Sequence, residues 1–312
     1  MHVFYTDHFV LPLPPGHRFP MSKYARVRER CLSEGVLQPA ELHEPPPARW
    51  EELALVHDSD YLHRVREGEL TPMEQRRIGF PWSPAMVERS RRSVGATIAA
   101  ARSALGAAAV HGWGVAVNLA GGTHHAYAGH GEGFCVFNDA AVAIRLLQHE
   151  GRIVRAAIID CDVHQGNGTA SIFATDPSVF TLSIHGAKNY PFRKERSVLD
   201  VELPDGAGDE VVLAALEMCL PRVLFDFRSE LVIYLAGADP YRDDRLGRLA
   251  MSPEGLRLRD ERVLEACRAA GVPVAITMAG GYARDTEDTV AIHLETVRTA
   301  AAQSAAASGR PA

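Results

Sequence analysis

The chain alternates between short apolar runs and longer segments whose apolar positions recur every three or four residues. The short runs are rich in Val, Ile and Leu and are mostly apolar throughout, as are strands of a parallel sheet covered on both faces. They predict strands at residues 3–5, 115–119, 154–159, 179–184, 231–235 and 274–277. The longer segments predict helices at residues 22–34, 84–109, 140–150, 209–222, 253–270 and 286–302. This alternation is typical of an α/β fold with a single open, mostly parallel sheet and helices on both faces.

No linker rich in Gly, Ser or Pro divides the chain, so we expect residues 1–312 to form a single domain. Two proline-rich segments, residues 11–20 and 44–47, predict loops. The residues from about 300 to 312 are rich in Ala and Ser, and we expect them to form a frayed tail.

The composition is typical of a soluble globular enzyme, with 46% apolar and 23% charged residues. The net charge of −6 argues against a dedicated nucleic-acid-binding protein. We expect no membrane span, because Arg102 interrupts the most apolar stretch, residues 94–110. The first residues lack the basic and apolar regions of a secretory signal, and the five cysteines include no CxxC pair. These features predict a cytoplasmic protein.

Polar clusters follow five of the predicted strands. They are residues 121–125 (GGTHH), 160–164 (DCDVH), 183–185 (SIH), 237–239 (GAD) and 280–282 (GGY). Open α/β sheets bind their ligands at the carboxyl ends of the strands. The clusters therefore predict a functional site at that end of the sheet.

Asp162 and His164 form a candidate metal-binding pair. On an extended segment, residues i and i+2 point to the same side, so the carboxylate and the imidazole can reach one ion. Asp239, which follows another strand, can supply a third ligand, and three protein ligands plus a water are the pattern of a catalytic zinc site. Such an ion polarises a carbonyl group and acidifies a bound water. The alternative is that Asp162 and His164 cap a loop or pair with each other.

His124 and His125 are candidates for proton transfer, because a neutral His is a general base and its protonated form a general acid. Asp160 and Asn167 are available partners that can fix the tautomers of the two rings. A carboxylate raises the pKa of a His more than an amide does, so the two histidines should differ. The alternative is a buried, hydrogen-bonded pair with a structural role. Tyr282 either donates a hydrogen bond to a developing oxyanion or packs beside the preceding glycine turn.

Motifs at residues 121–126 (GGTHHA), 133–135 (GFC), 160–168 (DCDVHQGNG), 237–239 and 280–282 occur in the order found in one enzyme family. On these motifs the chain resembles the zinc-dependent histone deacetylase and acetylpolyamine amidohydrolase family, which has the arginase-deacetylase fold. The resemblance extends from about residue 2 to residue 295. Residues 185–191, 244–247 and 252–255 are most similar to class IV members.

The resemblance implies one catalytic Zn²⁺ ion bound by Asp162, His164 and Asp239. It also implies a structural K⁺ or Na⁺ ion. The ligands of that ion would be main-chain oxygens of Asp160, Asp162 and His164, together with Ser183 and Ile184.

The resemblance also assigns catalytic roles. His124 and His125 match the tandem catalytic histidines, and His125 matches the general base and acid. Asp160 matches the carboxylate behind the first histidine, Asn167 stands where class I enzymes have Asp, and Tyr282 matches the catalytic tyrosine.

For substrate binding, Gly133 and Phe134 match the wall of the tunnel that holds the acyl-lysine side chain. Class I members hold the peptide backbone with an acidic residue at the rim of this tunnel. The candidates for such a residue are Asp58, Asp60, Glu67 and Glu69.

The resemblance, together with these residues, implies hydrolysis of Nε-acyl-lysine amides by metal-activated water, with a deacetylase or a deacylase as the activity. The partner would be an acylated peptide or protein, or a small acylated amine, and neither nucleic acid nor membrane. One alternative is an acetylpolyamine amidohydrolase, and another is a protein that binds acyl-lysine without cleaving it.

Overall fold

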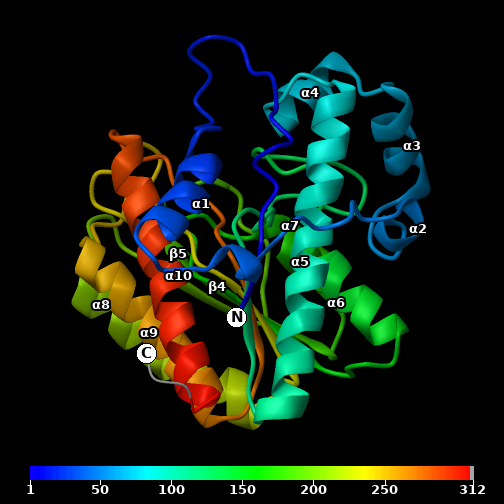
Figure 1. The fold of residues 1–312 in the computed structure, drawn as a ribbon. Coiled ribbons are helices and arrows are strands. Elements are labelled where there is room, and N and C mark those ends of the chain that lie inside the picture. The colour runs from blue at the N-terminus through cyan, green and yellow to red at the C-terminus, as the bar shows by residue number, and fades with distance from the viewer. Residues whose placement is uncertain (310–312) are drawn as a thin grey trace.

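The computed structural model of the protein describes residues 1–309 and is built on one eight-stranded sheet. All strand pairs are parallel, in the order β2-β1-β3-β8-β7-β4-β5-β6 (Figure 1). The strands are β1 (His2–Phe4), β2 (Leu42–His43), β3 (Val115–Asn118), β4 (Ala156–Asp160), β5 (Val179–Gly186), β6 (Leu199–Leu203), β7 (Leu231–Leu235) and β8 (Val274–Thr277). The predicted α/β fold with one open sheet is confirmed, and the sheet is wholly rather than mostly parallel.

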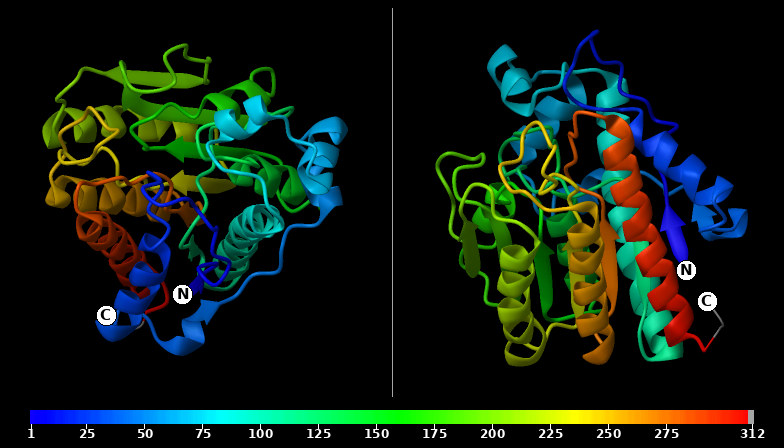
Figure 2. Two further views of the ribbon diagram at one scale, coloured as in Figure 1. Left: turned by 90° about the horizontal axis from the view of Figure 1, so that it is seen from above. Right: turned by 90° about the vertical axis from the view of Figure 1, so that its left-hand side faces the viewer.

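Helices cover both faces of the sheet. They are α1 (Lys23–Ser33), η1 (Pro39–Glu41), α2 (Trp50–Leu53), α3 (Ser59–Glu67), α4 (Pro72–Ile78), α5 (Pro84–His111), α6 (Asp139–His149), α7 (Asn167–Ile172), α8 (Asp209–Pro221), η2 (Arg222–Asp226), α9 (Pro253–Ala269) and α10 (Thr286–Ala307). Helices α1, α8, α9 and α10 pack on one face, and α5 and α6 pack on the other (Figure 2). Helices α2, α3 and α4 pack beside α5 around a separate apolar cluster.

Strand side chains alternate between the two apolar layers. In β3, Val115 and Val117 contact the layer of α1, α9 and α10, whereas Ala116 contacts the layer of α5 and α6. The α5 layer contains many alanines, among them Ala100 and Ala104, which allow the helix to approach the sheet closely.

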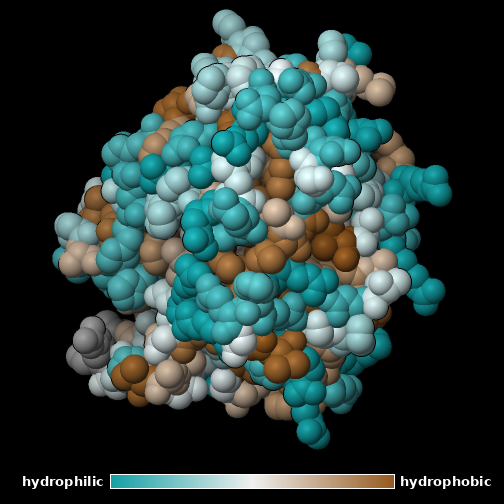
Figure 3. Space-filling model, turned by 90° about the vertical axis from the view of Figure 1, so that its right-hand side faces the viewer, coloured by the Kyte–Doolittle hydropathy of each residue, from teal (hydrophilic) through white to brown (hydrophobic). Residues whose placement is uncertain are grey.

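Helix α5 is long and apolar enough to span a membrane, but half of its most apolar segment is buried inside the fold. It begins at Ser83, whose hydroxyl accepts a hydrogen bond from the Met86 amide at 3.1 Å, and Pro84 occupies its first turn. Because half of its most apolar segment is buried, α5 is a core helix of the fold. The surface beside α2, α3 and α6 is mainly polar, with smaller groups of apolar residues among the polar ones (Figure 3).

The sequence pattern does not predict strands β2 and β6 or the helices α2, α3, α4 and α7. Strand β6 lies at the edge of the sheet, and its sequence LDVEL carries charges because one side of it is exposed. Strand β2 has only two residues, and the missed helices have four to nine residues each, so they show little periodicity.

The expectation of a frayed tail from about residue 300 is wrong for the first part of that segment. Helix α10 continues to Ala307, because the Ala-rich sequence strongly favours helix and Ala300 and Ala307 pack against the core. Gly309, with φ of 67°, follows the end of the helix. Residues 310–312 of the predicted tail lie outside the described residues.

Candidate active site

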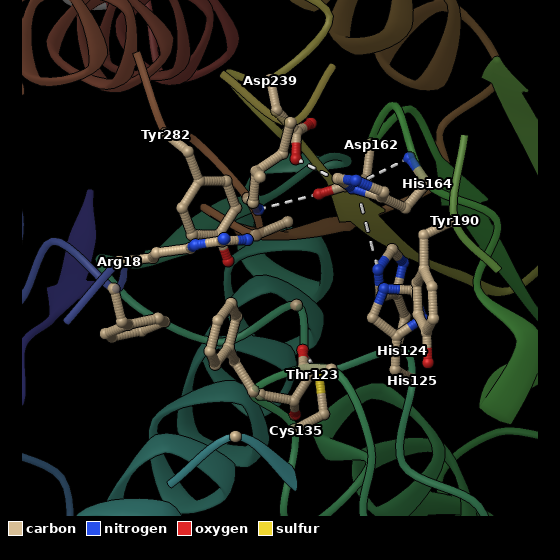
Figure 4. Close-up of a pocket in the computed structure, with 18 of the residues that line it drawn as sticks. Arg18, Thr123, His124, His125, Cys135, Asp162, His164, Tyr190, Asp239 and Tyr282 are labelled. Atoms are coloured by element: carbon tan, nitrogen blue, oxygen red, sulfur yellow. Dashed lines mark hydrogen bonds and ion pairs between the residues drawn. The ribbon is translucent and has the colours of Figure 1, made fainter. Parts of the chain in front are cut away.

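Asp162, His164 and Asp239 form a buried cluster at the carboxyl ends of β4 and β7. The potential ligand atoms of the three side chains all lie within 4.8 Å of one another. His164 Nδ1 is 2.9 Å from Asp162 Oδ1 and 3.2 Å from Asp239 Oδ2 (Figure 4). The arrangement expected from the DxH spacing and the separate Asp239 is thus present in the structure.

The chemistry of this cluster fits a divalent cation. Asp239 Oδ2 is buried and accepts no hydrogen bond of good geometry from residues 1–309. Burial raises the pKa of Asp239 to about 7, and the charge of Asp162 contributes to this rise. Burial alone would lower the pKa of His164, but the adjacent carboxylates of Asp162 and Asp239 raise it to about 10. A strong negative potential therefore acts on a small buried volume with one nitrogen and two carboxylate ligands.

Two glycines make room for the carboxylates. A side chain at Gly280 would collide with the carboxylates of both Asp162 and Asp239. A Cβ at Gly237 would lie 2.8 Å from Asp162 Oδ2 and 3.0 Å from Asp239 Oδ1. The backbone of Gly280 also donates a hydrogen bond to Asp162 Oδ2 at 2.8 Å, which orients this ligand.

A buried arginine, Arg259 of α9, holds the two loops that carry the cluster. Its Nη1 donates to the carbonyl oxygens of Cys161 at 3.2 Å and Gly237 at 2.6 Å, and its Nη2 pairs with Asp260 at 2.8 Å. Arg259 is fully buried, so these contacts are shielded from water. The sequence does not indicate this role, because α9 carries three other arginines, none of them buried, and the pattern does not distinguish Arg259 from them.

The paired histidines have different partners. His124 Nδ1 lies 2.7 Å from Asp160 Oδ2, and His125 Nδ1 lies 2.6 Å from Asn167 Oδ1. Burial alone would lower the pKa of His124, but the charges of Asp160 and Asp162 raise it to about 9. Burial lowers the pKa of His125 well below its ordinary value, and the positive charge on His124 lowers it further. The expected difference between the two histidines is therefore confirmed.

Tyr282 lies across the pocket from the two histidines (Figure 4). Its backbone N–H donates to Asp244 Oδ2 at 2.6 Å, and Arg245 Nε donates to its carbonyl at 3.2 Å. Burial raises the pKa of the phenol well above its ordinary value, so Tyr282 remains a proton donor at neutral pH. The ring also packs on Phe134, with centroids 6.0 Å apart, so it both contacts the apolar wall and lines the pocket.

Gly133 and Phe134 line the pocket beside His125, and both have left-handed backbone conformations, with φ of 55° and 68°. This conformation is costly for Phe134. The end of α4 holds it, because the amides of Gly133 and Phe134 donate to the carbonyls of Arg77 at 3.1 Å and Ile78 at 2.7 Å. A Cβ at Gly133 would lie 2.6 Å from the His125 ring, so glycine is required there.

A family model described as a histone deacetylase domain matches residues 17–297, nearly the whole chain. The chain belongs to the histone deacetylase family. Its relatives include an uncharacterized protein of Picosynechococcus, 46% identical over 293 residues, which are 93% of this chain and 95% of that protein. Histone deacetylase 2 of Arabidopsis thaliana is 33% identical over 296 residues, which cover 89% of this chain and 73% of the plant protein. The crystal structure of a histone deacetylase homologue from Aquifex aeolicus is 26% identical, covers 99% of this chain and 84% of its own, and has a TM-score of 0.82.

In this member of the histone deacetylase family, Glu132 connects two residues that the sequence did not indicate as neighbours, Asn167 and Tyr190. Its Oε1 accepts hydrogen bonds from Asn167 Nδ2 at 3.0 Å and from the Tyr190 hydroxyl. The Tyr190 ring packs edge-on against His125, with centroids 5.0 Å apart. Glu132 directly precedes the motif at residues 133–135. This position is the signal in the sequence that could have indicated its role in the site.

The four candidates for the acidic rim residue of class I members do not line the pocket of this family member. Among the described residues, the pocket of about 720 Å³ includes none of the four candidates, Asp58, Asp60, Glu67 and Glu69, in its lining. These residues lie on α3 or within two residues of its ends, outside the pocket lining, and the Asp58 amide donates to the Ala128 carbonyl at 3.0 Å. Arginines occupy the rim instead, among them Arg18 and Arg76.

A buried histidine, His57, supports the loop after the paired histidines. Its Nδ1 lies 3.0 Å from the Tyr127 carbonyl, and its Nε2 accepts from the Asn138 amide at 3.0 Å. Burial lowers the pKa of His57 to about 4. The folded state therefore binds fewer protons than the unfolded state between about pH 6.5 and pH 4.

We therefore expect the free energy of unfolding to fall as the pH decreases through this window, by about 3 kcal/mol from His57. Urea unfolding at pH 7 and pH 5 measures the part of this loss that falls between these pH values, about 2 kcal/mol. The variant His57→Gln should show a smaller decrease between the two pH values than the wild type. An identical pH dependence in both proteins would contradict the prediction.

Proposed function

We propose that the protein is a zinc-dependent hydrolase that removes acetyl or longer acyl groups from Nε-acyl-lysine side chains. The observation that carries this proposal is the position of the Asp162–His164–Asp239 cluster beside a histidine of lowered pKa and a protonated phenol in one pocket. The comparisons support the family and hence amide hydrolysis, and the site geometry supports the choice of residues.

Asp162, His164 and Asp239 would hold the zinc ion. When bound, zinc supplies a Lewis acid that polarises the amide carbonyl and acidifies the attacking water. Two carboxylate ligands balance its charge of +2, so the centre as a whole would be near neutral.

His125 is placed to move the proton of the attacking water. Asn167 Nδ2 donates to Glu132, so Asn167 turns its Oδ1 toward His125. His125 Nδ1 must then carry a hydrogen, and its Nε2 retains the lone pair of a general base. After the carbon–oxygen bond has formed, protonated His125 returns this proton to the amine nitrogen as the carbon–nitrogen bond breaks. The products are a carboxylate and the free lysine amine.

His124 supports this reaction as a charged neighbour. Its hydrogen bond to Asp160 and its raised pKa of about 9 favour the protonated form at neutral pH. The positive charge keeps the pKa of His125 low, which favours the neutral base before water attacks.

Tyr282 is proposed to donate its phenol hydrogen to the oxyanion that develops on the former amide oxygen. The variant Tyr282→Phe retains the ring and removes only this donor. We expect kcat to fall by roughly 10²–10³-fold, while zinc binding is retained because the phenol is not a ligand. Steady-state kinetics together with measured zinc content test this. Activity within about twofold of the wild type would leave Tyr282 a packing role only.

The function itself is tested by incubating the zinc-loaded protein with a neutral acetyl-lysine peptide and measuring released amine by mass spectrometry. We expect turnover that chelation abolishes and zinc restores. The absence of turnover with zinc bound would instead support a protein that binds acyl-lysine without cleaving it.

We also propose a structural K⁺ or Na⁺ ion near the backbone of Asp160, Asp162 and His164 with Ser183 and Ile184. In support, Asp160 of β4 and Ser183 of β5 are partners in the sheet register, which brings these segments together. A cytoplasmic location is likewise a proposal, supported by five cysteines that are buried and unpaired.

A further inference from the structure

The pocket is lined by many more basic than acidic side chains. Seven Lys and Arg residues line it, whereas the only two acidic residues in the lining are Asp162 and Asp239 of the proposed zinc cluster. The chain as a whole has the opposite balance, with a net charge of −6. The positive charge is therefore a local property of the pocket.

Six of the seven cations are exposed, and they come from separate segments around the pocket mouth. They are Arg18 of the N-terminal loop, Arg76 and Arg77 of α4, Lys188 after β5, and Arg245 and Arg248 after β7. These segments, far apart in the sequence, all contribute residues to the lining of the one pocket. The guanidinium group of Arg18 extends toward Tyr282 (Figure 4).

Neighbouring carboxylates neutralise only part of this charge. Asp205 serves two cations, at 3.0 Å from Arg248 and 3.8 Å from Lys188, and Glu132 lies 3.8 Å from Arg77. Within residues 1–309, Arg18, Arg76 and Arg245 form no ion pair, so the mouth retains an excess of positive charge. Low-dielectric walls strengthen such a field and raise the local concentration of anions.

The seventh cation, Arg89 of α5, is buried, with only 8% of its surface exposed. Its guanidinium lies 5.0 Å from the centroid of the Tyr24 ring and 5.5 Å from that of Phe19. Among the described residues it has neither an ion-pair partner nor a side-chain hydrogen bond. Desolvating an uncompensated charge is costly. Because no carboxylate pairs with Arg89 among the described residues, its charge adds to the positive potential of the pocket.

We propose that this pocket selects acyl-lysine residues flanked by acidic residues in the substrate chain. The inference rests on the proposed deacylase function and adds the charge of the substrate to it. Cations at the mouth attract carboxylates beside the acyl-lysine and repel lysine-rich peptides and cationic acylpolyamines. The charge pattern thus disfavours the acetylpolyamine alternative.

The test uses three acetyl-lysine peptides of equal length, in which the flanking residues are Asp and Glu, Ser and Gly, or Lys and Arg. At low ionic strength, we expect kcat/KM for the acidic peptide to exceed that for the basic peptide by at least about tenfold. The ratio should decrease as salt is added, because salt screens exposed charges. Equal values for the acidic and basic peptides would overturn the inference.

Charge-reversal variants identify the source of the preference. The double variant Arg18→Glu with Arg76→Glu should reduce or reverse the ratio of acidic to basic peptide turnover. The matched control is Arg152→Glu, since Arg152 is exposed in the loop before β4, at the opposite end of the strands. This control should leave the ratio unchanged, and a ratio unaltered by the double variant would contradict our assignment.

The neutral peptide separates the two proposals. If it is hydrolysed, the proposed function holds and the ratio alone decides the charge preference. If no peptide is hydrolysed, the proposed function fails, and fluorescence anisotropy with the same three peptides decides the preference. Tighter binding of the acidic peptide would support the inference, and equal binding would reject it.

Discussion

Replacement of Asp239 with Asn is expected to abolish hydrolysis and zinc binding while leaving the protein folded. The change removes one of two charged ligands and places a weakly coordinating amide in the same volume. Alterations to residues that merely support a ligand cost 10–100-fold in metal affinity, so loss of a ligand should weaken zinc binding by at least about 100-fold. Zinc content after dialysis and kcat/KM for a neutral acetyl-lysine peptide measure the two effects.

The thermal stability of this variant distinguishes a metal ligand from a structural residue. Burial raises the pKa of Asp239 to about 7, so at pH 8 the folded metal-free protein carries the cost of a buried carboxylate. Asn removes this cost, and we expect the Tm of metal-free Asp239→Asn to equal or exceed that of the metal-free wild type. The increase in Tm on adding zinc should disappear in the variant.

A matched control is Asp243→Asn, because Asp243 is exposed on the loop after β7 and, within residues 1–309, forms an ion pair only with Arg242 at 3.8 Å. It should retain both zinc and activity. Full zinc binding by Asp239→Asn, or a large loss of metal-free stability, would refute the assigned role.

The variant His125→Ala is expected to lower kcat by about 10²–10⁴-fold, because it removes the proposed proton carrier. Zinc content should be unchanged, since His125 is not in the cluster of potential ligands. The variant His124→Ala should have a smaller effect, because His124 acts through its charge. If His124→Ala costs more activity than His125→Ala, the two roles are reversed.

Combining His125→Ala with Tyr282→Phe tests whether the two residues act together. General base and oxyanion donor serve the same step, so the loss in the double variant should be well below the product of the single losses. A loss equal to that product would indicate that the residues act independently.

The central sheet could be predicted from sequence because its strands are buried on both faces. Strands β7 and β8 coincide with the predicted ranges, and His, Asp and Tyr directly follow several strands of the sheet. The order of strands and the contacts between distant segments could not be predicted in this way. Arg259 is an example, since its partners lie 98 and 22 residues away, at Cys161 and Gly237.

The rim of the pocket was the least predictable part. The choice of Asp58, Asp60, Glu67 and Glu69 relied on analogy and on nearness in sequence. The actual lining depends on irregular loops, such as the proline-rich loop that carries Arg18, and on the short helix α4. Neither has a hydrophobic periodicity that would place its side chains.

The left-handed backbone of Phe134 links the width of the pocket to the end of α4. Gly79 ends that helix with φ of 85°, and a Cβ there would lie 2.8 Å from the Phe134 ring. The ring therefore rests in a space that only glycine leaves open. Substitutions at the junction of Ile78 and Gly79 can shift this ring without altering any residue proposed to hold zinc or transfer protons. The width of the pocket can therefore change through this junction alone, separately from the residues proposed to carry out the chemistry.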